Sequence, residues 1–165
     1  MNIKRIARHL TMTHWQVNRT FTHQTLTIIE QAIKRSEASH VGEIRFIVEG
    51  ALDGMPLFHG QTARERAIDV FSQLRMWDTE YNNGVLIYLL YADQGVEIIA
   101  DRGIHSKVHS TEWTKICRQM ETAFKQNLYE IGVINGVQAV TASLTEHFPT
   151  TGAGSNELSD KPVML

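Results

Sequence analysis

Apolar residues recur along the chain at helical spacing in some segments and alternate with polar residues in others, which predicts a protein of both helices and strands. Residues 3–10 place Ile3, Ile6 and Leu10 on one helical face and basic side chains on the other. Residues 22–37 carry Leu26 and Ile33 at the same spacing. These two segments are the first predicted helices.

Three later segments are predicted to be strands. GEIRFIVEG, residues 42–50, alternates apolar and polar positions between two glycines. Residues 84–91 are almost continuously apolar, which is typical of a strand covered on both faces by helices. Residues 96–100 return as its partner after Asp93-Gln94-Gly95, where we expect a type I turn with the glycine in the left-handed position.

Three further helices complete the pattern. One begins at Thr62, because TARE has the spacing of a capping box between Thr62 and Glu65. The second is capped by Ser110, and the last ends before Pro149. The connection 51–60 contains Gly54 and a proline, so we expect it to be irregular.

The order of these elements predicts an α/β protein: a three-layer α/β/α sandwich around a small mixed β-sheet. Residues 42–92 form a right-handed parallel crossover, and the hairpin adds an antiparallel strand. We therefore divide the chain into a basic amphipathic helix with its connector (1–19), the main domain (20–149) and a flexible C-terminal tail (150–165). The loops after Val48 and Tyr91 are expected on one rim of the sheet.

Composition narrows the classes of function. The chain has 165 residues and a formal charge of −2, which gives no general attraction for nucleic acid. Its longest apolar run, Val85 to Ala92, is far shorter than a membrane span, and its N-terminus lacks the apolar core of a secretory signal. The single cysteine, Cys117, lies beside an apolar helical stripe and is expected to be a buried thiol. A cytoplasmic location is the simplest expectation.

Both ends of the chain offer alternatives. The first helix either packs on the domain or contacts a membrane surface or protein partner, since residues 1–19 contain no acidic residue. After a glycine and serine hinge beginning at Thr150, residues 162–165 are either disordered or dock on a groove or sheet edge. An unknown partner bound through either end is the corresponding hypothesis, with peripheral membrane contact included.

Acidic residues collect at the junctions of the predicted core, and they are the candidate chemistry. Glu43 begins the first strand, Asp78 precedes the second, Asp93 lies in the hairpin turn and Asp101 follows its end. Such oxygen donors suit a hard cation, Ca²⁺ or Mg²⁺, with Arg102 placed to hold an anion. The alternative is that these carboxylates cap turns, with Asp101 and Arg102 as a structural ion pair. We can assign no catalytic nucleophile.

The segment DTEYNNGVLIYLLYADQGVEIIADRGI, residues 78–104, resembles the TPM domain family. The resemblance rests on Asp78 ahead of NNGVL, an apolar strand, an acidic turn, and a second strand that ends in a short glycine motif. GEIRFIVEG is similar to the family's first strand, which often begins with a glutamate, here Glu43. At the end of the second strand this chain has Asp101 and Arg102 where the family usually has a glycine and an aromatic residue.

The resemblance implies a three-layer α/β/α fold and an acidic cleft that holds calcium or another divalent ion in some members. It also implies two functional hypotheses. The first is a non-catalytic interaction or accessory module whose acidic rim binds a divalent cation. The alternative is a metal-dependent, phosphatase-like hydrolase acting on a phosphomonoester, since phosphatase activity is attributed to plant members of the family.

Overall fold

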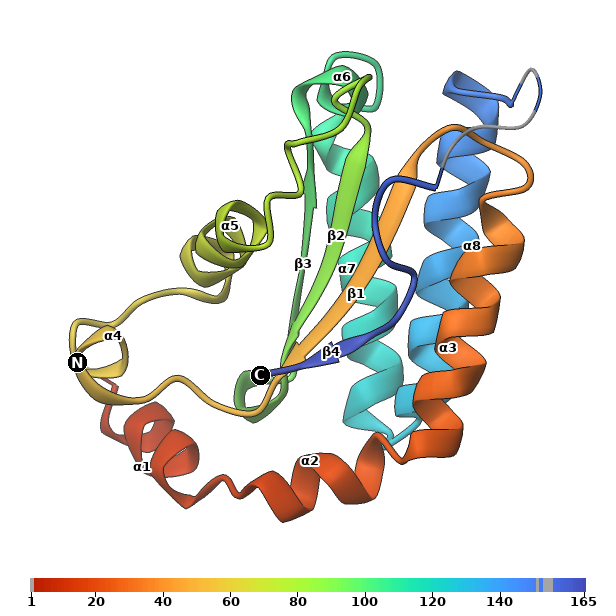
Figure 1. The fold of residues 1–165 in the computed structure, drawn as a ribbon. Helices are drawn as coiled ribbons and strands as arrows, with labels where there is room; N and C mark the ends of the chain where they lie inside the picture. The colour runs from red at the N-terminus through yellow and green to blue at the C-terminus, as the bar shows by residue number, and fades with distance from the viewer. Residues whose placement is uncertain (1, 151, 153–155) are drawn as a thin grey trace.

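The central sheet has the strand order β3-β2-β1-β4 in the computed structural model, which describes residues 2–150, 152 and 156–165 (Figure 1). Strands β1 (Glu43–Glu49) and β2 (Gly84–Leu90) are parallel, with Glu43 opposite Gly84. Strand β3 (Gly95–Ala100) is antiparallel to β2, and β4 (Val163–Met164) is parallel to β1. The predicted crossover, hairpin and mixed sheet are confirmed.

Strand β2 lies between two hydrophobic cores, and all seven of its residues are buried. Val85, Ile87 and Leu89 contribute to the core on one face, whereas Leu86 and Tyr88 contribute to the core on the other. Because successive side chains of a strand point to opposite faces, a continuous apolar run is what a strand with two covered faces requires.

Helices cover both faces of the sheet, as Figure 1 shows. On one face lie α3 (His23–Ser36), α7 (Ser110–Lys125) and α8 (Tyr129–His147). On the other lie α5 (Ala63–Gln73) and the short α4 (Gly54–Phe58). The α/β/α sandwich predicted from the element order is confirmed.

The N-terminal end of α5 also confirms a local prediction. Thr62 Oγ1 accepts from the Glu65 N–H, and the Glu65 carboxylate accepts from the Thr62 N–H at 2.7 Å, which is the reciprocal capping box.

Two local predictions are wrong. The turn after β2 contains a 3-10 helix, η1 (Tyr91–Asp93), and Gln94, not Gly95, has the positive φ of 51°. The Gln94 amide donates to the Tyr129 hydroxyl, which helps hold this backbone conformation. The N-cap of α7 is His109, whose Nδ1 accepts from the Thr111 N–H, so Ser110 is the first helical residue.

Three short helices have no counterpart in the sequence pattern. The connection expected to be irregular contains α4, and the connector after the first helix forms α2 (His14–Thr20), which has its own capping box. Helix α6 (Arg102–His105) follows β3 at once. Each has at most seven residues, too few for a clear helical repeat of apolar positions.

The C-terminal segment packs on the outer edge of β1. Besides the β4 pairing, the Leu165 N–H donates to the Val48 carbonyl at 2.9 Å. Of the two alternatives for residues 162–165, docking on a sheet edge is the one observed. The hinge expected from Thr150 onward falls mostly on residues 151 and 153–155, which lie outside the described residues.

A buried polar network joins α5 to the sheet at the C-terminal end of β1. Arg66 Nε donates to both oxygens of Glu49, at 2.8 and 3.1 Å, and the Tyr88 hydroxyl donates to the same carboxylate at 2.7 Å. Burial and the neighbouring Glu49 charge raise the pKa of Tyr88. Because each partner compensates the burial of another, the network fixes the position of α5 on this face.

Helix α1 (Ile3–Thr11) is attached to the hairpin turn through Asp93. Arg5 Nε donates to Asp93 Oδ2 at 2.8 Å, and His9 Nε2 lies 3.0 Å from Asp93 Oδ1. The Leu52 N–H donates to His9 Nδ1, so the ring proton is on Nε2 and is donated to Asp93. His9 is fully buried, and all three contacts join segments distant in the sequence.

No helix in the described part of the chain is long and apolar enough to cross a membrane.

Replacing Asp93 with alanine is expected to lower the free energy of unfolding by about 2 to 4 kcal/mol, because it leaves buried Arg5 and His9 without their acceptor. Urea denaturation measures the change. The matched control is Asp53→Ala, since Asp53 is exposed and its side chain caps nothing. Equal losses in the two variants would contradict a structural role for Asp93.

Candidate functional site

An acidic cavity of about 100 Å³ lies at the N-terminal ends of β1 and β2. It collects side chains from the end of α3, the two strand starts and the C-terminal segment. Its lining residues are Glu37, His40, Val41, Gly42, Glu43, Tyr81, Asn83, Asn156 and Glu157.

The local structure explains why these side chains meet. Glu37 is the C-cap of α3, and Glu43 is the first residue of β1 only six positions later. The Ile44 N–H points back to Glu37 Oε1 at 3.4 Å. Asn83 precedes β2, and its carbonyl accepts from the Glu43 N–H at 3.0 Å. The turn between α3 and β1 thus brings two carboxylates beside one amide side chain.

The C-terminal segment forms one wall of the cavity. The Leu158 N–H donates to Glu43 Oε2 at 3.1 Å, and Glu157 Oε2 accepts from the Glu80 N–H at 3.1 Å. Asp160 is buried and accepts from the Asn156 amide at 2.8 Å. Four carboxyl groups therefore lie around this end of the sheet. None of the four forms a salt bridge with a basic residue among those the structure describes.

Burial and mutual repulsion alter the acidity of these carboxyls. Burial, then the charges of Asp160 and Glu43, raise the pKa of Glu37 from 4.5 to about 8. Burial also raises the pKa of Glu43, although the N–H groups of Leu158 and Glu157 act in the opposite direction. At neutral pH Glu37 therefore retains a proton, because removing it would add a negative charge to an acidic, partly desolvated site.

Several buried polar atoms of the cavity have no hydrogen-bond partner among the described residues. They are both ring nitrogens of His40 and the Oδ1 of Asn83, in side chains that are almost fully buried. Burial lowers the pKa of His40, so its ring is neutral. Unpaired buried polar groups are costly, and here they line the same cavity as the carboxylates.

The chemistry of this donor set fits a hard divalent cation. Carboxylate and amide oxygens are the ligands that Ca²⁺ and Mg²⁺ prefer, and Asn83 Oδ1 is an acceptor without a donor. Within residues 2–150, 152 and 156–165, no group of three or more His, Cys, Asp or Glu side chains is already arranged for a metal ion. Binding would require the carboxylates to lose a proton and move together.

Of the carboxylates that the sequence predicted to bind a cation, only some lie at this end of the sheet. Glu43 lies in the cavity. Asp101 flanks β2 on its other side, with its N–H donating to the Gly84 carbonyl, so about two strand spacings, roughly 10 Å, separate it from Glu43. Its Oδ1 accepts from the Arg102 N–H, whereas its buried Oδ2 has no partner in the described chain.

Asp78 and Arg102 are both exposed near the same end of the sheet. Asp78 contacts Arg75 at 2.6 Å, and Arg102 Nε donates to Asn82 Oδ1 at 2.9 Å. The contact with Asn82 replaces the ion pair with Asp101 that the sequence suggested as an alternative. Arg102 is exposed, and its other guanidinium nitrogens have no hydrogen-bond partner among the described residues.

Asp93 belongs to the opposite end of the sheet, and its inclusion in the same acidic site is wrong. The turn η1 joins the C-terminal end of β2 to β3, so the length of a seven-residue strand, roughly 20 Å, separates Asp93 from the acidic cavity. There it accepts from Arg5 and His9 and is a structural acceptor.

Five residues of the site were missed from the sequence: Glu37, His40, Asn83, Glu157 and Asp160. One signal was present, because a glutamate at a predicted helix end followed after six residues by a glutamate at a predicted strand start places both near one edge. The contribution of the C-terminal segment had no such signal, since it depends on a contact between residues 115 positions apart.

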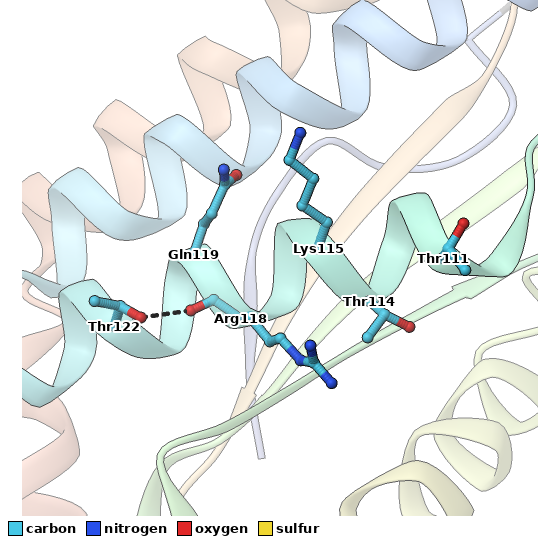
Figure 2. A pocket seen from close by; sticks show the side chains of 6 residues that line it. All are labelled: Thr111, Thr114, Lys115, Arg118, Gln119 and Thr122. Atoms are coloured by element: carbon cyan, nitrogen blue, oxygen red, sulfur yellow. Dashed lines mark hydrogen bonds between the residues drawn. The ribbon is translucent and has the colours of Figure 1, made fainter.

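A second hollow lies along the outer side of α7 and has different chemistry. Figure 2 shows Thr114 and Arg118 on one side of the helix, and Lys115 and Gln119 on another. The Thr122 hydroxyl donates to the Arg118 carbonyl of the same helix at 2.8 Å. The hollow has no carboxylate lining it, so it offers no counterpart to the acidic cavity.

Comparison with known proteins finds one family model and several solved structures with a similar fold. The sequence model of the TPM domain matches residues 17–143. The fold is similar to the NMR structure of the BA42 protein from the psychrophilic bacterium Bizionia argentinensis, with a TM-score of 0.76 and 29% sequence identity over 87% of this chain and 94% of that chain. No curated protein matches the sequence.

The raised pKa of Glu37 predicts a pH-dependent stability. In the unfolded chain this carboxyl ionises near pH 4.5, whereas in the folded protein it does so near pH 8. Its contribution to the free energy of unfolding is therefore complete below pH 4.5 and is lost as the pH rises to about 8. Over this interval the unfolding free energy of the wild type should decrease by about 1 to 3 kcal/mol, allowing for partial solvent exposure. Glu37→Gln cannot ionise at this position and should not show the decrease.

Urea denaturation at several pH values between 4.5 and 8.5 measures this effect as the difference between wild type and variant. The exposed Glu146→Gln on α8 is the matched control and should leave the pH dependence unchanged. A pH dependence that is identical in wild type and Glu37→Gln would contradict the assignment.

Proposed function

We propose, from the premise that this chain belongs to the TPM domain family, that it is a non-catalytic accessory domain that binds a divalent cation in the acidic cavity. The observation that carries the proposal is that Glu37 and Glu43 line the same cavity as the Asn83 Oδ1, which has no donor in the described chain. The pKa of Glu37, raised to about 8, supports it. Burial and the neighbouring carboxylates keep this carboxyl protonated at neutral pH, and a bound cation would stabilise its ionised form.

The ligands we propose come from three chain segments. Glu37 and Glu43 supply carboxylate oxygens, and Asn83 supplies the amide oxygen that has no donor in the described chain. Water molecules would complete the coordination, as is usual for Ca²⁺ and especially Mg²⁺. Because Glu37 must release its proton, cation affinity is expected to increase with pH.

Cation binding should also affect the C-terminal segment. Glu43 accepts from the Leu158 N–H, and the buried Asp160 contributes to the raised pKa of Glu37. An ion between Glu37 and Glu43 would reduce the repulsion that Asp160 experiences and so stabilise the docked segment. This coupling between an ion and a docked peptide segment suits an accessory domain.

The surroundings of Cys117 and Arg102 favour the non-catalytic candidate. Cys117 is buried on α7, and burial raises the pKa of its thiol to about 12, so it cannot supply a thiolate nucleophile at neutral pH. Arg102 is near Asp101 and not in the lining of the acidic cavity.

Adding Ca²⁺ or Mg²⁺ at millimolar concentration should raise the melting temperature at pH 8 by several degrees relative to EDTA, and by less at pH 5.5. The double variant Glu37→Gln/Glu43→Gln should lose this increase, because it removes both charged ligands. Differential scanning calorimetry measures the shift, and NMR should show cation-dependent amide shifts at Ile44 and Leu158.

Asp78→Asn is the matched control, since Asp78 is an exposed carboxylate near the same end of the sheet. It should keep the full increase. The proposal is refuted if neither cation raises the melting temperature of the wild type, or if the double variant responds as the wild type does.

A phosphatase-like hydrolase is the second candidate, favoured by the exposed Arg102 beside Asp101 at the same end of the sheet. A guanidinium with free donors can hold a phosphate group. If the chain hydrolyses para-nitrophenyl phosphate in the presence of Mg²⁺ or Ca²⁺, Arg102→Gln should raise KM, and Glu37→Gln/Glu43→Gln should abolish turnover. Turnover that both variants retain in full would sink this candidate.

A further inference from the structure

Large apolar side chains are exposed on three short helices near the N-terminus. Ile3 and Leu10 on α1 are 72% and 63% exposed, and Trp15 on α2 is 65% exposed. Met55 and Phe58 on α4 are also exposed. Helix α1 contacts α4, since Ile6 packs against the core to which Leu57 belongs. Scattered apolar residues are normal on a surface, but several on adjoining elements mark an interaction site.

The packing of α1 does not explain its exposed apolar residues. The buried side of this helix is formed by His9 and the partly buried Ile6. Ile3, Ala7 and Leu10 recur at helical spacing on the strip beside Ile6, and all three are exposed. The strip therefore remains available for a partner after the helix has docked on the domain.

Basic residues border this apolar strip. Lys4 and Arg8 lie next to it on α1, and both are exposed. Residues 1–29 contain four Lys or Arg residues and no Asp or Glu, although the chain as a whole carries a charge of −2. Arg5 is directed inward to Asp93. Arg8 lies 3.8 Å from the same carboxylate, but half of its side chain is exposed. Lys4 and Arg19 are also exposed.

This end of the molecule is remote from the acidic cavity. Figure 1 shows α1, α2 and α4 together, near the end of the sheet where β1 finishes, whereas Glu43 lies where β1 begins. The inference below does not rest on cation binding, and its test is carried out in EDTA.

We propose that the surface formed by α1, α2 and α4 docks on an anionic lipid bilayer. An exposed apolar strip flanked by Lys and Arg on a helix is the arrangement with which helices lie in the plane of a membrane interface. Trp15 adds an amphipathic ring suited to the headgroup level, and the Arg19 guanidinium lies 5.3 Å from its centre. The absence of acidic residues from this stretch of sequence favours phosphate headgroups over a protein surface of mixed charge.

The test is co-sedimentation of the full chain with vesicles in EDTA at low salt. It should bind vesicles of phosphatidylcholine mixed with an equal amount of phosphatidylglycerol, and bind phosphatidylcholine alone much more weakly. Lys4→Gln removes one positive charge and should lower the affinity about fivefold, which is the effect typical of one basic residue near an anionic surface. Ile3→Ser/Leu10→Ser should lower it by at least tenfold, since it removes two apolar side chains from the contact.

Matched controls come from α7 and α8, which are not part of the proposed surface. Ile131→Ser removes an apolar residue that is 53% exposed, and Lys115→Gln removes an exposed charge. Both should bind as the wild type does, and circular dichroism should show every variant folded. Three outcomes would overturn the proposal: no binding to anionic vesicles, equal losses in variants and controls, or concentration-dependent self-association that Ile3→Ser/Leu10→Ser abolishes in the absence of lipid.

Discussion

The complete burial of β2 is the constraint on which the rest of the molecule depends. A strand packed on both faces by helices excludes charged side chains along its length, because an unpaired charge in that position would be prohibitively costly. No residue of β2 is charged, and charged groups gather at both ends of the sheet. One end of the sheet gathers Glu37, Glu43 and Asp160, and the other gathers Arg5 and Arg8 around Asp93.

The fold was largely predictable because its signals are local. The capping box at Thr62, the alternation in β1 and the apolar run of β2 each depend on residues close in the sequence, and each is confirmed. Membership of the TPM domain family, inferred from the hairpin and the NNGVL segment, is also confirmed. The prediction of the hairpin turn was wrong in detail: Gln94 has the positive φ, and its side chain makes a long-range contact with Tyr129 that the local sequence does not indicate.

The candidate site was less predictable, because sequence alone did not specify which acids share an end of the sheet. Asp93 and Asp101 both flank β3, yet they lie at its two ends, and only Asp101 is near the start of β2. Glu157 and Asp160 lie in the C-terminal segment, which reaches the site because it pairs with β1. The positions of the acidic residues in the sequence therefore did not indicate which of them lie together in the fold.

The attachment of α1 has a consequence for the order of folding. His9 bonds to groups 43 and 84 positions away, the Leu52 N–H and the Asp93 carboxylate, so its binding site exists only once the sheet has formed. Contacts of such sequence separation carry a large loop-closure entropy and are expected after the transition state. Weakening this attachment should therefore accelerate unfolding and leave the refolding rate almost unchanged. The N-terminal helix would then be the first part of the native structure to detach, and its dissociation a step distinct from the loss of the sheet.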